Sequence, residues 1–228
     1  ELAEVTAVSP APGGFTVSTP DGDYAAKAVV LATGAQHRKL GVDREDELAG
    51  NGVCYCAVCD GAFYKDRPVA VAGGGDAALQ DALLLANVCS QVYIIHRRDE
   101  FRAEAANVSA VLSRGNITRL MNSRVVALEG EGELSGIVVE DKATLERRSI
   151  AVDGLFVAVG YEAANAAFAP IAKLDAAGWF TAGEDCAAGT PGVFAAGDCR
   201  AKTVRQLTTA VGDGAAAAVA ACRYIDSL

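Results

Sequence analysis

Hydrophobic and polar residues follow two different periods along this chain, and the change of period marks its organisation. Three short segments near the start alternate as strands do, namely residues 4–8, 14–18 and 25–31. Asp21-Gly22-Asp23 is a turn signal between the last two. We therefore predict a small antiparallel ribbon whose last strand runs into the glycine turn Ala32-Thr33-Gly34.

The middle of the chain has the pattern of a βαβ unit. Residues 68–72 and 91–95 are short apolar runs, typical of buried strands, and the first is followed by Gly73-Gly74-Gly75. Between them, residues 76–86 have helical spacing, with apolar side chains at positions 79, 82, 83 and 86 on one face. A strand, a glycine-rich turn, a helix and a second strand in this order indicate a parallel sheet.

Later segments continue the mixture of helices and strands. A second helix is expected over residues 103–113, and an alanine-rich helix closes the chain over about 204–225. Strands are expected at residues 125–128, 136–139, 149–152, 155–160 and 192–198. The whole pattern predicts an α/β fold.

Composition narrows the class of protein. A chain of 228 residues has room for one large domain or two modest ones, and 51% hydrophobic against 21% charged residues excludes disorder. The net charge of −9 argues against nucleic acid as a partner, and no apolar run approaches the roughly 18 residues of a membrane span. Because the chain starts without Met and without a secretory signal, we expect it to be the later part of a longer protein.

The glycine turn at 73–78 matches the fingerprint G-x-G-x-x-A of dinucleotide-binding proteins. The first glycine permits the tight turn, the second allows the backbone to approach a pyrophosphate, and the small third residue lets the helix pack on the strand. The phosphates would lie at the helix N-terminus, where free N–H groups and the dipole favour anions. The residues of this predicted site are Gly73, Gly74, Gly75, Asp76, Ala77 and Ala78. The alternative is a glycine turn without a ligand.

The segment after the second strand of this unit predicts which dinucleotide binds. NAD sites usually place Asp or Glu there, to bind the ribose 2′-hydroxyl. This chain has a histidine and three arginines instead: His96, Arg97, Arg98 and Arg102. Arginine makes bidentate, charge-assisted bonds with phosphate, so the sequence favours NADPH over NADH. The alternative is a solvated basic turn.

Seven cysteines are present, and three of them cluster as C-x-C-x-x-C at positions 54, 56 and 59. Cys56 and Cys59 have the spacing of a redox disulfide, and Asp60 follows them. A zinc site is disfavoured because the chain has only two histidines and no second cysteine pair, so no metal is expected. Two inert core cysteines are the third interpretation of the pair.

The remaining cysteines raise two further questions. Cys54 either competes for pairing or packs as a small residue. The odd, scattered cysteine count favours the reducing cytosol.

Together these motifs resemble the low-molecular-weight thioredoxin reductases. The resemblance also involves Ala32-Thr33-Gly34, Phe156 to Gly160, Gly192 to Asp198 and Arg205-Gln206, and spans nearly the whole chain. It implies two Rossmann-like, three-layer domains, one inserted in the other. Residues 1–36 and 166–228 would form the FAD-binding domain, and residues 41–161 the NADPH-binding domain with the disulfide.

The resemblance also implies a path for electrons, from NADPH to FAD, to the Cys56–Cys59 disulfide and on to thioredoxin. Cys59 would face the flavin, Cys56 would attack the partner's disulfide, and Asp60 would act as acid and base. The further cofactor residues implied are Thr33, Gly34, Gly160, Gly197, Asp198, Arg205 and Gln206. Gly34 and Gly160 are the expected hinges between the domains.

One feature of the family is absent from these 228 residues, namely the first glycine fingerprint, which seats the ADP half of FAD. We therefore keep three hypotheses. The first is an NADPH-dependent thioredoxin reductase, a homodimer when full-length. The second has the same chemistry with a glutaredoxin-like protein or a peroxiredoxin system. The third is a non-catalytic NADPH-binding fragment.

Overall fold

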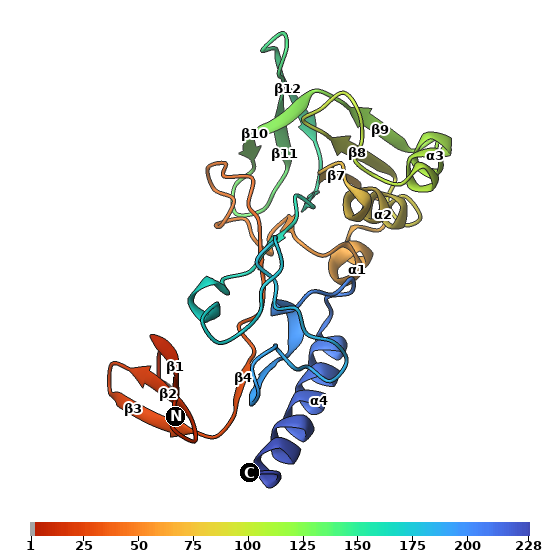
Figure 1. Cartoon of the computed structure of the whole chain (residues 1–228). Helices are drawn as coiled ribbons and strands as arrows, with labels where there is room; N and C mark the ends of the chain where they lie inside the picture. Colours follow the sequence, from red (N-terminus) through yellow and green to blue (C-terminus); the bar gives the residue numbers. More distant parts are fainter. Residues whose placement is uncertain (1–2) are drawn as a thin grey trace. The chain divides into compact units, whose positions relative to one another are not determined.

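A computed structural model describes residues 3–228, and the chain divides into two compact units (Figure 1). One unit is His37–Gly160, and the other combines Glu1–Gln36 with Tyr161–Leu228. The chain thus crosses between the units twice, at residues 36–37 and 160–161. These crossings lie beside the domain limits expected from the sequence, at residues 36, 41, 161 and 166.

The unit His37–Gly160 is built on a parallel sheet of five strands in the order β6-β13-β7-β8-β9. Its strands are β6 (Val53–Cys54), β7 (Pro68–Ala72), β8 (Gln91–Ile95), β9 (Ile117–Leu120) and β13 (Gly154–Val157). Strands β7, β8 and β13 are almost entirely apolar because both faces of the sheet are covered. The α/β fold class predicted from the sequence is confirmed.

Helices cover one face of this sheet. They are α1 (Ala57–Asp60), α2 (Asp76–Leu85) and α3 (Ala105–Ser113), and a 3₁₀ turn, Gly61–Tyr64, continues α1. Helix α2 buries Ala78, Leu79, Ala82 and Leu85 against Val69, Val71, Val92 and Ile94 of the sheet. The spacing of those four positions is therefore the reason why α2 lies on β7 and β8.

An antiparallel sheet covers the other face. Its strands are β10 (Ser123–Glu129), β11 (Gly136–Asp141) and β12 (Arg147–Ala151). Val125, Leu128, Ile137 and Val139 pack with Ala70, Ala72, Leu155 and Val157 of the parallel sheet. The unit is thus a three-layer sandwich of helices, parallel sheet and antiparallel sheet.

The other unit contains an antiparallel ribbon and a parallel pair of strands. The ribbon comprises β1 (Ala7–Ala11), β2 (Gly14–Thr19) and β3 (Gly22–Ala26), and the pair comprises β4 (Val29–Leu31) and β15 (Val193–Ala195). Two short strands, β5 (Gln36–His37) and β14 (Tyr161–Glu162), pair with each other, and 3₁₀ turns occur at Ala166–Phe168 and Gly197–Cys199. Helix α4 (Leu207–Asp226) packs Ala217 and Ala221 against Phe194 of β15.

Two predicted strands near the start of the chain differ from those in the structure. The strand expected over 25–31 is two strands, because β3 pairs with β2 up to Ala26 and β4 then pairs with β15. The strand expected at 4–8 lies at Ala7–Ala11 instead, where all five residues pair with β2. In both cases the partner strand decides where the strand begins and ends.

None of the helices within residues 3–228 is both long enough and apolar enough to cross a membrane.

Candidate functional site

The glycine turn of the fingerprint connects β7 to α2, as its spacing predicts. Gly75 is the N-cap of α2 and offers no side chain to the free N–H groups of the first turn. A Cβ atom on Gly73 would lie 2.5 Å from the Ala158 carbonyl oxygen and 2.7 Å from the Ala78 Cβ. Gly73 and Ala78 are therefore small so that the helix can start directly on the sheet.

The loop that carries the arginines, residues 96–102, is tied to this turn by backbone contacts. The Arg102 N–H donates a hydrogen bond of 2.7 Å to the Gly74 carbonyl. Just beyond the loop, the Asp76 carboxylate accepts bonds from the Glu104 N–H (2.8 Å) and the Asn107 amide (2.7 Å). These bonds join the start of α2 to the start of α3, and they hold Arg102 beside the open N-terminus of α2.

His96 supports this turn from within. Its ring is only 7% exposed, stacks on Phe101 with centroids 5.6 Å apart, and has Nε2 3.0 Å from the Glu100 carbonyl. A Cβ atom on Gly74 would lie 2.1 Å from its Nδ1, so only glycine fits there. Burial lowers the pKa of His96, and the charges of the nearby arginines act in the same direction. The imidazole is therefore neutral at pH 7, and the exposed positive charge comes from Arg97 and Arg102.

The structure pairs Cys56 with Cys59 in a disulfide, at a Cα–Cα distance of 5.3 Å. Cys56 is the N-cap residue of α1, and the Cys59 N–H donates to its Sγ at 3.1 Å. A backbone donor aimed at sulfur stabilises the thiolate form after the disulfide is reduced. This favours Cys56 as the nucleophile of the pair.

A pocket of about 490 Å³ lies beside the disulfide, within the unit His37–Gly160. Both disulfide cysteines and Asp60 line it, together with several aromatic side chains: His37, Tyr55, Phe63 and Tyr64. Two apolar side chains near the disulfide are strongly exposed, Phe63 at 77% and Val58 at 70%. The surface next to the disulfide is therefore partly apolar.

Cys54 is a free thiol and not a partner in the disulfide. It is 6% exposed, and its Sγ lies 3.3 Å from the Tyr64 hydroxyl. Burial raises the pKa of this thiol above its usual value, and the Asp60 carboxylate raises it further. The sequence left open whether Cys54 competes for pairing, and in this structure it is a packed residue that also makes a hydrogen bond.

A second group of predicted residues lies in the other unit, after β4 and β15. The Thr33 hydroxyl donates to the Asn165 side-chain oxygen at 2.7 Å, and the Asn165 amide donates to the carbonyls of Gly178 and Cys199. Asn165 thus fixes the turn after β4 to the segment after β15. Gly34 belongs to that first turn, whereas Gly160 ends the His37–Gly160 unit and accepts a bond from the Arg38 N–H.

Asp198 has an unfilled hydrogen-bonding site. Within residues 3–228, its Oδ1 is the buried side-chain oxygen or nitrogen without a hydrogen-bond partner. Buried polar atoms are nearly always paired, so an unpaired carboxylate oxygen indicates a missing donor from a ligand or water. Asp198 follows Gly197 in the 3₁₀ turn after β15 and precedes α4. A group that donates hydroxyl or amide hydrogens fits this position.

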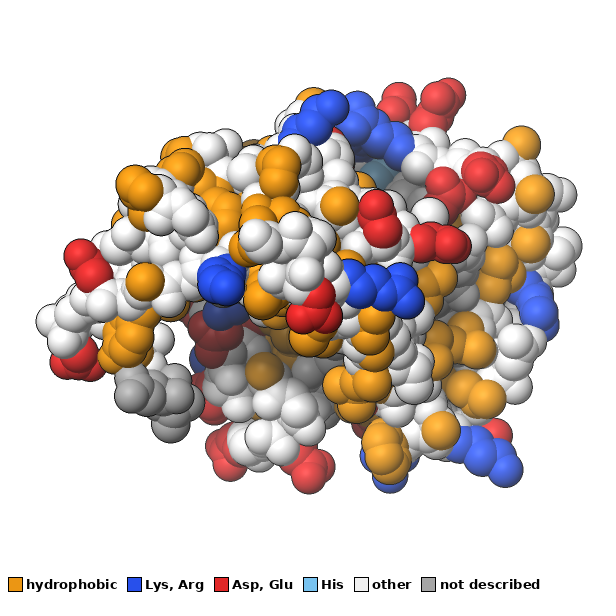
Figure 2. Space-filling model, turned by 60° about the horizontal axis from the view of Figure 1, so that its bottom comes forward, with side chains coloured by type: hydrophobic (Ala, Val, Ile, Leu, Met, Phe, Trp, Pro, Cys, Tyr) orange, Lys and Arg blue, Asp and Glu red, His pale blue; other side chains and the backbone are white. Residues whose placement is uncertain are grey.

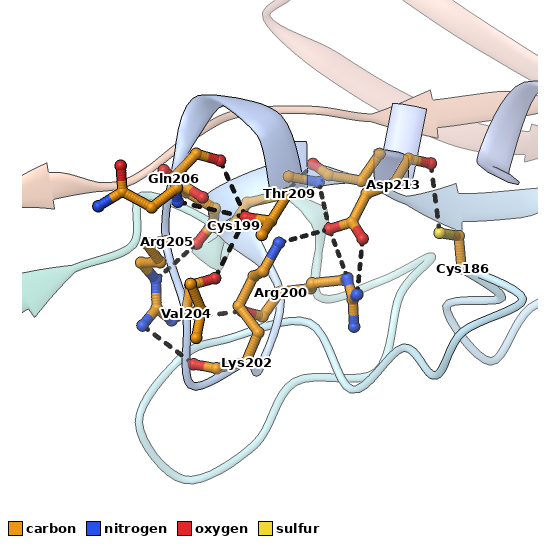
Figure 3. Close-up of polar contacts among 12 residues, drawn as sticks. Cys186, Cys199, Arg200, Lys202, Val204, Arg205, Gln206, Thr209 and Asp213 are labelled. Carbon is orange, nitrogen blue, oxygen red and sulfur yellow. Dashed lines mark hydrogen bonds and ion pairs between the residues drawn. The ribbon is translucent and has the colours of Figure 1, made fainter. Parts of the chain in front are cut away.

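Arg205 and Gln206 hold the start of α4 in place (Figure 3). The Arg205 guanidinium donates to the carbonyls of Asp198, Arg200 and Lys202 and lies 4.0 Å over the Trp179 ring. Gln206 is the N-cap of α4 and forms a reciprocal capping box with Thr209. Both residues shape the loop around Asp198, and much of the donor capacity of Arg205 is used within the protein.

Asp213 is the centre of a partly buried ionic cluster on α4 (Figure 3). It binds Arg200 through two bonds of 2.7 Å, Lys202 at 2.8 Å and the Gly197 N–H at 3.1 Å. Arg200 and Lys202 hold the pKa of this carboxyl well below its usual range. The cluster fixes the turn that carries Asp198 against α4, and no motif in the sequence indicates it. A charged residue inside an alanine-rich helix is the signal that would have found it.

Figure 2 shows acidic, basic and hydrophobic side chains interspersed on the face drawn there. Within residues 3–228, no group of three or more His, Cys, Asp or Glu side chains is arranged to hold a metal ion.

Comparison with known proteins places this arrangement in a family. Residues 2–214 match the family model described as pyridine nucleotide-disulphide oxidoreductase. The thioredoxin reductase of Treponema pallidum is 41% identical over 225 residues, which are 99% of this chain and 73% of that protein. The thioredoxin reductase of Streptomyces clavuligerus is 43% identical over 206 residues, 90% of this chain and 64% of that protein. The chain therefore spans about two thirds to three quarters of these relatives.

A solved structure shares the fold as well. The thioredoxin reductase from Streptococcus pyogenes superposes with a TM-score of 0.91 at 35% sequence identity, covering 99% of this chain and 74% of that one. The motifs, the redox disulfide and these similarities lead to one conclusion. The chain belongs to the pyridine nucleotide-disulphide oxidoreductase family, and within it to the thioredoxin reductases.

Proposed function

We propose that this chain passes electrons from NADPH, by way of FAD, to the Cys56–Cys59 disulfide and on to thioredoxin or a similar small disulfide protein. One observation carries the proposal. The redox disulfide and a fingerprint turn joined to an arginine loop lie in the same compact unit, His37–Gly160.

NADPH fits the glycine turn between β7 and α2. Gly73 to Ala78 would receive the pyrophosphate at the helix N-terminus, and Arg97, Arg98 and Arg102 would bind the 2′-phosphate. His96, neutral and buried, would keep the loop against Gly74. Asp76 serves the same purpose through its bonds to the start of α3.

FAD fits the turns after β4 and β15. The unpaired Asp198 Oδ1 would accept a hydrogen bond from a hydroxyl of the flavin's side chain. Thr33, Gly34 and Gly197 would line the same site, which Arg205 and Gln206 shape. When bound, the two cofactors supply a hydride and a carrier that delivers its two electrons to the disulfide.

The cysteines then exchange with the partner. The reduced Cys56 thiolate attacks the partner's disulfide, which forms a mixed disulfide and releases one partner thiolate. Cys59, deprotonated, attacks the Cys56 sulfur, which releases the second partner thiolate and restores the Cys56–Cys59 disulfide. Asp60 moves the proton that Cys59 loses and the released thiolates gain. The partner is reduced by two electrons and the pair is oxidised by two.

A protein suits this site better than a small disulfide does. Val58 and Phe63 expose apolar surface near the two sulfurs, and a folded partner covers such groups when it docks. Thioredoxin, a glutaredoxin-like protein and a peroxiredoxin all present a disulfide on a folded surface. Thioredoxin is preferred because the relatives from Treponema and Streptomyces are named thioredoxin reductases.

Trapping of the mixed disulfide tests the exchange. The chain is reduced with dithiothreitol, freed of reductant and mixed with oxidised thioredoxin, glutaredoxin or peroxiredoxin. We expect Cys59→Ser to form a covalent adduct with thioredoxin through Cys56, because the second thiol that would release it is gone. Mass spectrometry of the adduct identifies the bonded cysteine.

Two variants serve as controls in this experiment. Cys56→Ser should form no adduct, and Cys222→Ser, which removes the exposed cysteine on α4, should behave as the parent chain. An adduct with another of the three partners would replace thioredoxin in the proposal. Failure to form an adduct through Cys56 with any of them would leave a dinucleotide-binding protein without reductase function.

A further inference from the structure

Two residues of the disulfide pocket have no part in the exchange described above. Cys54 and Tyr64 line the pocket together with Cys56, Cys59 and Asp60. Cys54 is the free thiol of the C-x-C-x-x-C cluster. Tyr64 ends the 3₁₀ turn that begins directly after Asp60.

The Tyr64 ring is fixed by strand β13. It meets the Phe156 ring edge-on, with centroids 5.4 Å apart. A Cβ atom on Gly154 would lie 2.7 Å from the Tyr64 Cε1, so a glycine at this position of the strand makes room for the ring. The phenol is therefore held by the central sheet, although Tyr64 itself belongs to a short turn.

Cys54 is held by the same strand. It lies on β6, and its register partner on β13 is Phe156, the residue that also contacts the Tyr64 ring. The Tyr64 hydroxyl and the Cys54 Sγ are 3.3 Å apart. Because both side chains pack on one rigid strand, this contact is a built part of the fold.

The protonation of the two groups bears on which of them donates the hydrogen bond between the Tyr64 hydroxyl and the Cys54 sulfur. Burial raises the pKa of both the Cys54 thiol and the Tyr64 phenol, so each keeps its proton at neutral pH. The Asp60 carboxylate lines the same pocket as Cys54 and helps to raise the Cys54 pKa, and a carboxylate can only accept hydrogen bonds. Either group could donate in the Tyr64–Cys54 contact, but a thiol that donates to Asp60 leaves its sulfur free to accept from the Tyr64 hydroxyl.

We propose that Cys54 and Tyr64 are positioning residues for Asp60: the Tyr64 hydroxyl donates to the Cys54 sulfur, and the Cys54 thiol donates to the Asp60 carboxylate beside the Cys56–Cys59 disulfide. This inference rests on the proposed function, in which Asp60 carries the proton of the exchange. It also explains why Cys54 does not compete for the disulfide, because a buried, protonated thiol is a poor nucleophile.

Single-turnover kinetics test this role without bound cofactors. Each variant is reduced with dithiothreitol and freed of reductant, and its oxidation by oxidised thioredoxin is followed at several pH values. We expect Cys54→Ala and Tyr64→Phe each to slow oxidation about tenfold and to shift its pH profile, because a displaced acid–base group loses much of its effect. Cys54→Ser keeps a donor and should stay within about twofold of the parent chain.

Further variants keep the outcome interpretable. Cys89→Ala removes another buried thiol of the same unit and should leave rate and profile unchanged. The other ionisable groups that line the pocket are Cys56, Cys59, His37 and Tyr55, and Arg67 adds a fixed positive charge near the phenol. Thermal unfolding of each variant separates loss of folding from loss of rate.

Two results would overturn the inference. One is a parent-like rate in Cys54→Ala and Tyr64→Phe while Asp60→Asn is slow, which would leave the proposed function standing. The other is equal slowing in Cys54→Ser and Cys54→Ala, which would assign Cys54 to packing alone. A parent-like rate in Asp60→Asn itself would instead refute the acid–base role of Asp60 in the proposed function.

Discussion

In the proposed function, individual arginines decide which dinucleotide this chain prefers. Arg97 and Arg98 directly follow His96 at the carboxyl end of β8, the strand next to β7 in the sheet. An acidic residue at the end of such a strand would repel a 2′-phosphate, whereas arginine binds it with two charge-assisted hydrogen bonds. On this proposal, a preference for NADPH would depend on these side chains and not on the glycine turn, which would bind the pyrophosphate of either dinucleotide.

Replacing these arginines should change the affinity for one cofactor only. We expect Arg97→Ala or Arg98→Ala to weaken NADPH binding by about 1.5–3 kcal/mol, or roughly tenfold or more, with little change for NADH. Calorimetric titration of both dinucleotides measures the difference. Arg148→Ala, an exposed arginine of β12 in the antiparallel sheet, is the matched control and should change neither affinity. Equal losses for NADPH and NADH would show that the loop does not read the 2′-phosphate.

At the scale of elements, the ionic cluster of Asp213 joins α4 to the turn that carries Asp198. The apolar side chains with which helix α4 packs on β15 are mostly alanines, two of them buried, so its apolar contacts are small. Asp213 is 12% exposed and pairs with two cations that are 15% and 9% exposed. Removing one partner of a buried ion pair leaves the other charges uncompensated. The cluster is therefore the main polar attachment of this helix.

Asp213→Asn should destabilise the protein by about 3 kcal/mol at neutral pH, because Arg200 and Lys202 lose their counter-charge. The folded pKa of Asp213 lies below its unfolded value of about 4. Its stabilising contribution is therefore complete above about pH 4 and is lost as the pH falls towards the folded pKa. Thermal midpoints of parent and variant should differ at pH 7 and converge below about pH 4.

The exposed Asp226, near the end of the same helix, provides the control, and Asp226→Asn should unfold as the parent chain does. A difference between parent and Asp213→Asn that is absent at pH 7, or that persists undiminished in acid, would contradict the ionic account.

Hydrophobic periodicity predicts a helix or strand well where the element that packs against it requires the same boundaries. The βαβ unit begins and ends within a residue of its predicted positions, since 68–72, 76–86 and 91–95 correspond to β7, α2 and β8. The predicted strand 25–31 is divided after Ala26 because its first part pairs with β2 and its last part pairs with β15. The local sequence pattern contains no information about these two partners. Likewise, the sequence predicts His96 as a ligand of the 2′-phosphate together with the arginines. Its packing against Gly74, which the structure shows, cannot be predicted from the local sequence.

At the scale of the whole molecule, each of the two units carries one of the proposed cofactor sites. One holds the disulfide and the proposed NADPH turn, and the other holds the unpaired Asp198 and the proposed FAD residues. The family could be predicted from motifs because its chemistry needs particular residues at fixed spacing. Asn165, Asp213 and Tyr64 could not, because their roles come from contacts between distant segments. The homodimer and the cytosolic location stay predictions.

The most direct test is to ask whether NADPH reduces the Cys56–Cys59 disulfide. The oxidised chain is incubated with FAD and NADPH, free thiols are alkylated, and mass spectrometry locates the labels. The account predicts new labels on Cys56 and Cys59, faster with NADPH than with NADH, and none when either cofactor is omitted. A disulfide that stays closed with NADPH and FAD, yet opens with dithiothreitol, would contradict it.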